Sequence, residues 1–138
     1  MNCRDEPIRF VIRLLVRHPR MSADEITVGL GMAPSAVWPV GEPRRTPKGN
    51  PLPGVYEESK WSKSYHVSVE RRLFRPAIEI LNDLEQRAEF IDDLVSTGGT
   101  VEVSLDLPGG RNFGDSITPS ELRRFASLQV GLGFEVFP

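Results

Sequence analysis

Three segments of the chain alternate apolar and polar residues, which is the pattern of strands that bury one face. They cover residues 9–18, 61–70 and 100–107, and residues 132–137 repeat the pattern with Leu132, Phe134 and Val136 inward. The arginine spacing in the first segment would also suit a helix. Its shortness and its β-branched residues favour a strand.

Two capping boxes predict where helices begin. Ser22-Ala-Asp-Glu25 starts a helix over 23–30, and Thr118-Pro-Ser-Glu121 starts another, which we expect Gly131 to end. Between them, apolar residues recur every three or four positions from 75 to 96. This spacing predicts one long helix with an acidic outer face.

Residues 35–60 form a stretch rich in proline and glycine. Because proline cannot donate to a ladder, we expect a long loop here, with a short edge strand at 52–57 as the open alternative. The whole chain, 1–138, then forms one α+β domain. We expect a two-layer sandwich, in which three helices cover one face of a mixed sheet of four to five strands. With the edge strand, the first six elements follow the order βαββαβ, which predicts a ferredoxin-like variant.

Composition narrows the function classes. The chain has 138 residues, a net charge of −2 and one cysteine, Cys3. The charge makes nucleic acid an unlikely partner, because phosphate binding needs a clear basic excess. One thiol makes no internal disulfide, and no apolar run is long enough for a signal peptide or a membrane span. We expect a cytoplasmic protein without membrane contact.

No catalytic motif is present. His18 and His66 are the two histidines, and the sequence contains no Gly-x-Ser-x-Gly elbow. The carboxylates of residues 75–96 follow one exposed stripe instead of facing each other across a cleft. We therefore expect no enzyme, no cofactor and no metal site.

The proline-rich stretch is the strongest candidate for binding. Its candidate residues are Trp38, Arg44, Arg45, Lys48, Tyr56 and Trp61. Basic residues interleaved with aromatic ones are typical of binding surfaces, and long ordered loops often carry function. The competing interpretation is a loop pinned by its tryptophans, with its arginines paired to the acidic helix. The second, mixed face of the sheet, which carries Arg13 and Arg17, is a separate candidate.

Several segments resemble the domain-of-unknown-function 4279 family. They are Ser22-Ala-Asp-Glu-Ile26, Gly29-Leu-Gly31, Gly41-Glu-Pro-Arg-Arg-Thr46, Tyr56-Glu-Glu-Ser-Lys-Trp61 and the predicted helix at 122–131. The resemblance spans nearly the whole chain and implies a small, mostly bacterial, stand-alone protein. It implies no activity and no catalytic residue.

Two functional hypotheses follow. The first is a non-enzymatic interaction module that binds a partner protein or forms a homodimer; an immunity-type protein that neutralises a toxin is one version. The second is a small-ligand or nucleotide sensor that uses the basic, aromatic stretch at 38–63. Stabilisation by a metabolite would separate the two, because a ligand that binds only the folded state raises the melting temperature.

Overall fold

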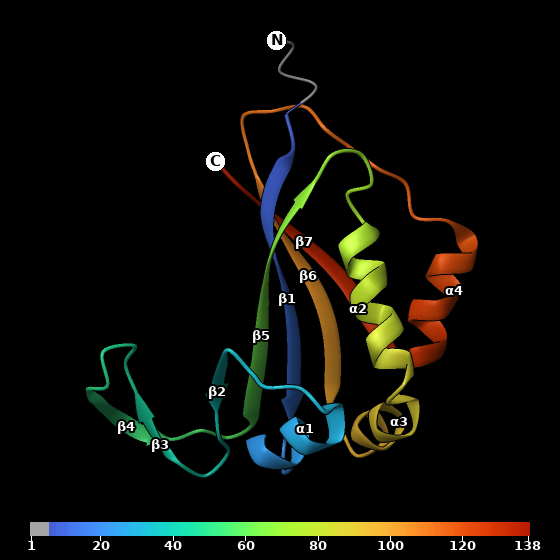
Figure 1. Cartoon of the computed structure of the whole chain (residues 1–138). Coiled ribbons are helices and arrows are strands. Elements are labelled where there is room, and N and C mark those ends of the chain that lie inside the picture. Colours follow the sequence, from blue (N-terminus) through green and yellow to red (C-terminus); the bar gives the residue numbers. More distant parts are fainter. Residues whose placement is uncertain (1–5) are drawn as a thin grey trace.

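The computed structural model describes residues 6–138, so Cys3 lies outside the described residues. These residues form four helices, a five-stranded sheet and a separate two-stranded hairpin (Figure 1). The elements are β1 (Ile8–His18), α1 (Ala23–Leu30), β2 (Ala36–Trp38), β3 (Pro43–Arg45), β4 (Pro51–Val55), β5 (Ser59–Val69), α2 (Arg75–Glu85), α3 (Ala88–Ser96), β6 (Thr100–Pro108), α4 (Pro119–Leu128) and β7 (Val130–Phe137). No helix among them is both long and apolar enough to span a membrane.

The sheet has the order β2-β5-β1-β6-β7. Strand β1 lies at its centre and pairs antiparallel with β5 and with β6. Strand β2 is antiparallel to β5, and β7 is parallel to β6. The predicted α+β class and the mixed sheet are therefore confirmed, and β2 and β7 form the two edges.

One face of this sheet carries the core. Ile12, Leu14 and Val16 of β1 are buried, while Arg13, Leu15 and Arg17 lie on the opposite face. The buried side chains of the four helices belong to the same apolar cluster as these strand residues. The alternation in the sequence thus reports which face the helices cover. The other face, called here the open face, carries none of the helices formed by residues 6–138.

The predicted helix at 75–96 is two helices, which is a correction. α2 ends at Glu85 and α3 begins at Ala88, with Arg87 outside helical geometry (φ −119°). The change of direction brings Phe90 of α3 against Gly29 of α1, and Arg87, just before α3, against Gly31, just after α1. A Cβ at either glycine would collide with these side chains. Packing between helices distant in sequence, rather than local propensity, therefore breaks the apolar stripe.

The stretch 35–60 is more ordered than the predicted loop. Its edge strand is β2, which pairs with β5, and not the segment at 52–57. β4 covers part of that segment but pairs only with β3, forming a hairpin outside the main sheet. β2 lies before Pro39 and keeps its backbone donors, which favours it over the proline-containing β3 and β4 as a strand of the main sheet.

The C-terminal strand also differs from the prediction. α4 ends at Leu128 with Gln129 in the left-handed conformation (φ 63°), so Gly131 lies in β7 and does not cap the helix. Leu132 is only partly buried, and Phe134 and Val136 are 67% and 59% exposed. The alternation correctly placed these side chains on the helix side of the sheet, but the core does not cover this end of the strand.

Candidate functional site

The open face gathers positive charge near its β2 edge. In the paired register Arg17 lies between Thr100 and Lys60, and Lys60 lies opposite Trp38. Side chains paired across neighbouring strands project from the same face, about 5 Å apart. The sheet therefore places two cations and one indole in a single row. Two residues further along, Leu15 and Ser62 form the next row of this floor.

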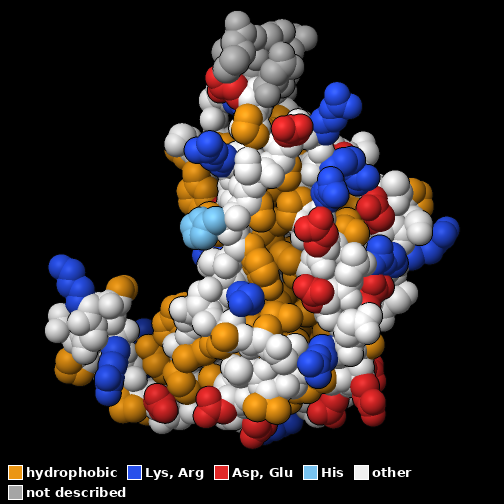
Figure 2. All heavy atoms as spheres, in the orientation of Figure 1, with side chains coloured by type: hydrophobic (Ala, Val, Ile, Leu, Met, Phe, Trp, Pro, Cys, Tyr) orange, Lys and Arg blue, Asp and Glu red, His pale blue; other side chains and the backbone are white. Residues whose placement is uncertain are grey.

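The hairpin of β3 and β4, residues 43–55, forms an arm that stands apart from the sheet (Figures 1 and 2). The Thr46 N–H donates to the Asn50 carbonyl (2.8 Å) and closes the turn of the arm. At its base the Tyr56 N–H donates to the Glu42 carbonyl (3.0 Å), and the Arg45 N–H donates to the Tyr56 hydroxyl (3.2 Å). Backbone bonds thus shape the arm, while its side chains remain exposed.

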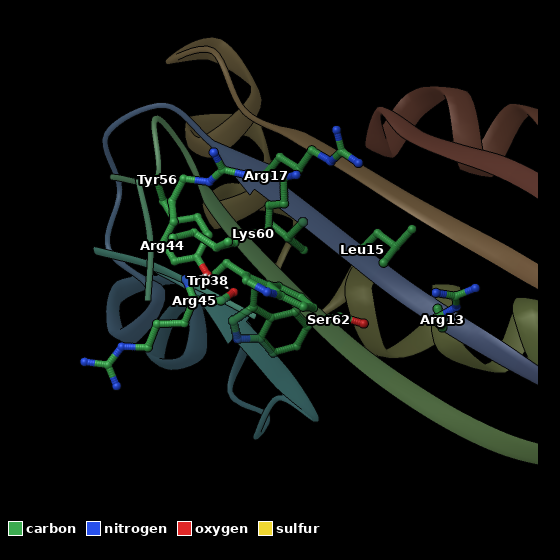
Figure 3. Close-up of a pocket in the computed structure, with 12 residues that line it drawn as sticks. Arg13, Leu15, Arg17, Trp38, Arg44, Arg45, Tyr56, Lys60 and Ser62 are labelled. Carbon is green, nitrogen blue, oxygen red and sulfur yellow. Dashed lines mark hydrogen bonds between the residues drawn. The ribbon is translucent and has the colours of Figure 1, made fainter. Parts of the chain in front are cut away.

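A groove of about 430 Å³ lies between the arm and the open face (Figure 3). The sheet supplies Arg13, Leu15, Arg17, Trp38, Lys60 and Ser62, and the arm with its base supplies Arg44, Arg45, Leu52 and Tyr56. Five of these side chains are basic, and no carboxylate belongs to the described lining. An apolar floor with aromatic and basic walls can hold an anionic group while covering an apolar one.

Ion pairs reduce the free charge of the groove only in part. Arg13 contacts Asp106 at 2.6 Å, and Arg17 reaches Glu58 at 3.8 Å with both side chains well exposed. Within residues 6–138, Arg44, Arg45 and Lys60 take part in no ion pair. Three of the five basic side chains thus have no carboxylate partner among the described residues, so the groove keeps an excess of positive charge.

The structure brings five of the six predicted binding residues to this groove, four of them with accessible side chains. Trp38, Arg44, Arg45 and Tyr56 line it. Figure 3 shows the Arg45 side chain pointing away from the other labelled side chains, so its guanidinium lies at the outer rim. Arg44 is the better placed of the two arginines. The acidic face of α2 and α3 lies outside the lining, and the alternative of arginines paired to that face has no ion pair in support among the described residues.

The other two predicted residues play different parts. The Trp61 side chain is 1% exposed, and its indole N–H donates to the Thr27 hydroxyl (3.0 Å), so Trp61 is a core residue that borders the groove from beneath. Lys48 lies in the turn at the tip of the arm, outside the groove. The alternation over 61–70 already placed Trp61 on the apolar face of its strand, whereas Trp38 lay in the stretch predicted as a loop, where no pattern sets the face.

The prediction separated the loop from the sheet's second face, whereas the structure joins them. Arg13, Leu15 and Arg17 from β1 and Lys60 from β5 line the groove together with the arm. The alternation in β1 already placed Arg13 and Arg17 on the open face. That β1 lies beside β5, and β5 beside β2, is a matter of long-range pairing.

Of the two histidines, one is buried and the other is exposed. His18 is buried; its Nδ1 accepts the N–H groups of Arg20 (3.0 Å) and Met21 (2.8 Å), and its Nε2 donates to the Thr97 hydroxyl (2.7 Å). Burial and the positive charge of Arg20 lower the pKa of His18, which favours the neutral ring. Its hydrogen bonds to the 20–21 backbone and to Thr97 give it a structural role. His66 is exposed on the open face, and the described residues hold no group of three potential metal ligands.

Comparison with known proteins adds no functional assignment to the groove. No family model, no curated protein and no solved structure matches the chain. The functional argument therefore rests on the groove itself: its charge, its aromatic side chains and its position at one edge of the sheet.

Proposed function

We propose that the protein is a non-enzymatic binding module that holds an acidic segment of a partner protein in the basic groove. The observation that carries the proposal is a groove whose described lining contains five basic side chains and no carboxylate: Arg13, Arg17, Arg44 and Lys60, with Arg45 at the outer rim. Complementary charge raises the rate of association and selects the partner.

The side chains of the groove also match those that dominate protein interfaces. Tryptophan, tyrosine and arginine are the residues most enriched among interface hot spots. Trp38 and Tyr56 supply the aromatic anchors on opposite sides of the groove, one from β2 and one from the base of the arm. Leu15 adds an apolar floor that an extended segment would cover.

A nucleotide is the second candidate ligand. The groove volume of about 430 Å³ falls within the usual range of small-ligand sites. Trp38 could stack on a base while Lys60 and Arg44 contact phosphate oxygens, which combines base stacking with charge-assisted hydrogen bonds. The groove is open and bordered by a projecting arm. This shape suits an extended segment of a partner protein better than a small ligand, which usually binds in an enclosed pocket.

We also propose a finer fold assignment, a ferredoxin-like variant. The order β2-β5-β1-β6, antiparallel throughout, together with the helices after β1 and β5, supports a ferredoxin-like two-layer core that α4 and β7 extend. The resemblance to the domain-of-unknown-function 4279 family and the cytoplasmic location remain predictions.

The test uses a fluorescent poly-glutamate peptide as probe, with ATP as the probe for the second candidate. Arg44→Glu with Lys60→Glu reverses two unpaired charges of the groove. Arg71→Glu with Arg123→Glu makes the same change of net charge at exposed positions outside it. We expect the groove variant to bind poly-glutamate at least about tenfold more weakly, and the control variant to bind like the wild type.

Two results would count against the protein-partner proposal. Equal weakening in both variants would show that net charge, and not the groove, attracts the peptide. Stronger binding of ATP than of poly-glutamate, with loss of ATP binding in the groove variant alone, would favour the nucleotide candidate. Thermal unfolding of each variant verifies that the fold is intact.

A further inference from the structure

The positive charge of the basic groove is concentrated at one end. Arg13 contacts Asp106 at 2.6 Å, and the Arg45 guanidinium lies at the outer rim. The other three basic side chains gather beside the arm, at the end away from Arg13 (Figure 3). They are called here the cationic end: Arg17 from β1, Lys60 from β5 and Arg44 from the arm. A ligand of the groove therefore meets most of its free charge there.

Two cations of this end lie directly opposite each other in the sheet. Arg17 pairs with Lys60 in the register of β1 and β5, which places their Cβ atoms about 5 Å apart on the open face. Like charges in this position destabilise a sheet. Within residues 6–138 their only ion pair joins Arg17 to Glu58 at 3.8 Å, with both side chains well exposed. An anion bound between Arg17 and Lys60 would relieve this repulsion.

A buried hydroxyl lies next to the pair. Ser62 follows Lys60 by two residues on β5, so it projects from the same face about 7 Å along the strand. It is 7% exposed and lines the groove, and its hydroxyl makes no hydrogen bond with another described residue. Covering a hydroxyl without giving it a hydrogen bond is costly. A ligand over this floor should therefore offer it an acceptor.

Arg44 reaches the cationic end from the other side of the groove. It lies on β3 of the arm and takes part in no ion pair among the described residues. Trp38, opposite Lys60, and Tyr56, at the base of the arm, place aromatic side chains beside the cations. A group bound between sheet and arm thus meets donors from three separate segments of the chain.

We propose that the cationic end binds a phosphate monoester, carried by the partner segment as a phosphorylated side chain. This phosphate site rests on the proposed function, because the groove has to hold the segment that carries the group. A phosphate monoester has a charge of about −1.5 to −2 at neutral pH and three strong acceptor oxygens. Arg17, Lys60 and Arg44 can each donate to one of these oxygens, and the Ser62 hydroxyl can donate as well.

A carboxylate suits the cationic end less well. It has two oxygens in one plane, which a single guanidinium already satisfies in a bidentate pair. Carboxylates on one side of an extended segment follow each other about 7 Å apart, whereas Arg17 and Lys60 lie about 5 Å apart in one row. One dianion between the two side chains interacts with both.

The first test uses three fluorescent glutamate-rich peptides that differ only at one central position, which is phosphoserine, glutamate or serine. We expect the wild type to bind the phosphoserine peptide about tenfold more tightly than the glutamate peptide. Lys60→Gln should reduce this preference to about twofold, because it removes one cation of the site. Arg45→Gln makes the same change of charge at the rim and should keep the preference.

The second test changes no charge. Ser62→Ala should weaken binding of the phosphoserine peptide about fivefold and leave the glutamate peptide unaffected, because it removes one donor to a phosphate oxygen. Equal weakening of both peptides would contradict a phosphate site at this floor. Thermal unfolding of each variant verifies that it folds.

The like-charge pair gives a third, independent measurement. Without any ligand, Lys60→Gln should keep or raise the unfolding midpoint, because it removes the repulsion from Arg17. Inorganic phosphate, compared with chloride at equal ionic strength, should raise the midpoint of the wild type by about 2 °C and leave that of Lys60→Gln unchanged. A clear fall of the midpoint in Lys60→Gln without ligand would show that Lys60 stabilises the fold, which contradicts the argument from repulsion.

AMP, which carries the same group on a nucleoside, identifies the source of the phosphate. AMP binding that Lys60→Gln abolishes, without binding of any peptide, would support the phosphate site and reject the partner segment. Equal affinity of the wild type for the phosphoserine and glutamate peptides, with both lost in Arg44→Glu with Lys60→Glu, would overturn the phosphate site and leave the proposed function standing. A preference for phosphoserine that Arg45→Gln reduces as much as Lys60→Gln would also overturn it. No binding of any peptide or of AMP would overturn both.

Discussion

Replacing Asp115 with alanine should destabilise the fold more than its loop position suggests. The Asp115 side chain is 11% exposed and lies in the segment between β6 and α4. Its Oδ2 accepts the Phe74 N–H (3.1 Å) and the Arg72 guanidinium (3.2 Å), and its Oδ1 accepts the Ser116 N–H (2.7 Å). Phe74 is the N-cap of α2 and its side chain makes no capping hydrogen bond. Asp115 instead accepts the N–H of this N-cap residue and places a negative charge at the helix N-terminus from a distant segment.

The magnitude follows from these contacts. The charge-assisted bond to the Phe74 N–H is this helix-end interaction, and its loss costs about 1.5–3 kcal/mol. The ion pair to the half-exposed Arg72 adds at most about 1 kcal/mol. Because solvent can replace part of the Ser116 bond, we expect a net loss of about 2–3 kcal/mol, which lowers the unfolding midpoint by roughly 10 °C.

The contribution of Asp115 to the free energy of unfolding should depend on pH. Burial alone would raise the pKa of Asp115, but the N–H groups of Phe74 and Ser116 and the Arg72 guanidinium together lower it below its ordinary value of 3.8. Its contribution is therefore complete above that value and is lost as the pH falls through the lowered pKa of the folded state. The difference in the free energy of unfolding between wild type and Asp115→Ala should become smaller in strong acid.

Urea unfolding followed by circular dichroism measures both effects. Asp83→Ala, at an exposed carboxylate on α2 without an ion pair among the described residues, is the control and should stay within about 0.5 kcal/mol of the wild type. A loss below about 0.5 kcal/mol for Asp115→Ala, or a gap that does not change with pH, would refute this account of the cap.

Three further outcomes are expected. Arg44→Ala with Arg45→Ala should leave the unfolding midpoint within about 2 °C of the wild type, because both side chains are exposed and unpaired among the described residues. Gly29→Ala should destabilise by about 1–3 kcal/mol despite alanine's higher helix propensity, because its Cβ would collide with the Phe90 ring. Stability should fall as the pH drops below the ordinary value of 6.5 for His18, because the folded protein holds that ring neutral at a lowered pKa.

Each outcome has a control. A fall of several degrees for the arginine variant would make the two arginines structural ties and weaken the binding proposal. Phe90→Ala in the Gly29→Ala background should relieve the collision, so an unchanged penalty would contradict it. His66→Gln should keep the acid response of the wild type, whereas His18→Gln should lose it; the reverse would exclude His18 as the titrating group.

Local chemistry was enough to predict most of the helix starts and strands. Ser22 and Thr118 accept the N–H groups of Glu25 and Glu121, as the capping boxes predict. The alternation along β1 separated core residues from the arginines of the open face. Such features depend on neighbours within a few residues, so the sequence contains them directly.

Tertiary structure alone decided which surfaces meet. The break between α2 and α3 depends on the contact of Phe90 with Gly29, and the exposure of Phe134 depends on where the helix layer ends. The groove exists because β1 lies beside β5 and β5 beside β2, which places Arg17, Lys60 and Trp38 in one row. These pairings join residues far apart in the chain, and their free energy is a sum over the whole core, which no local pattern encodes.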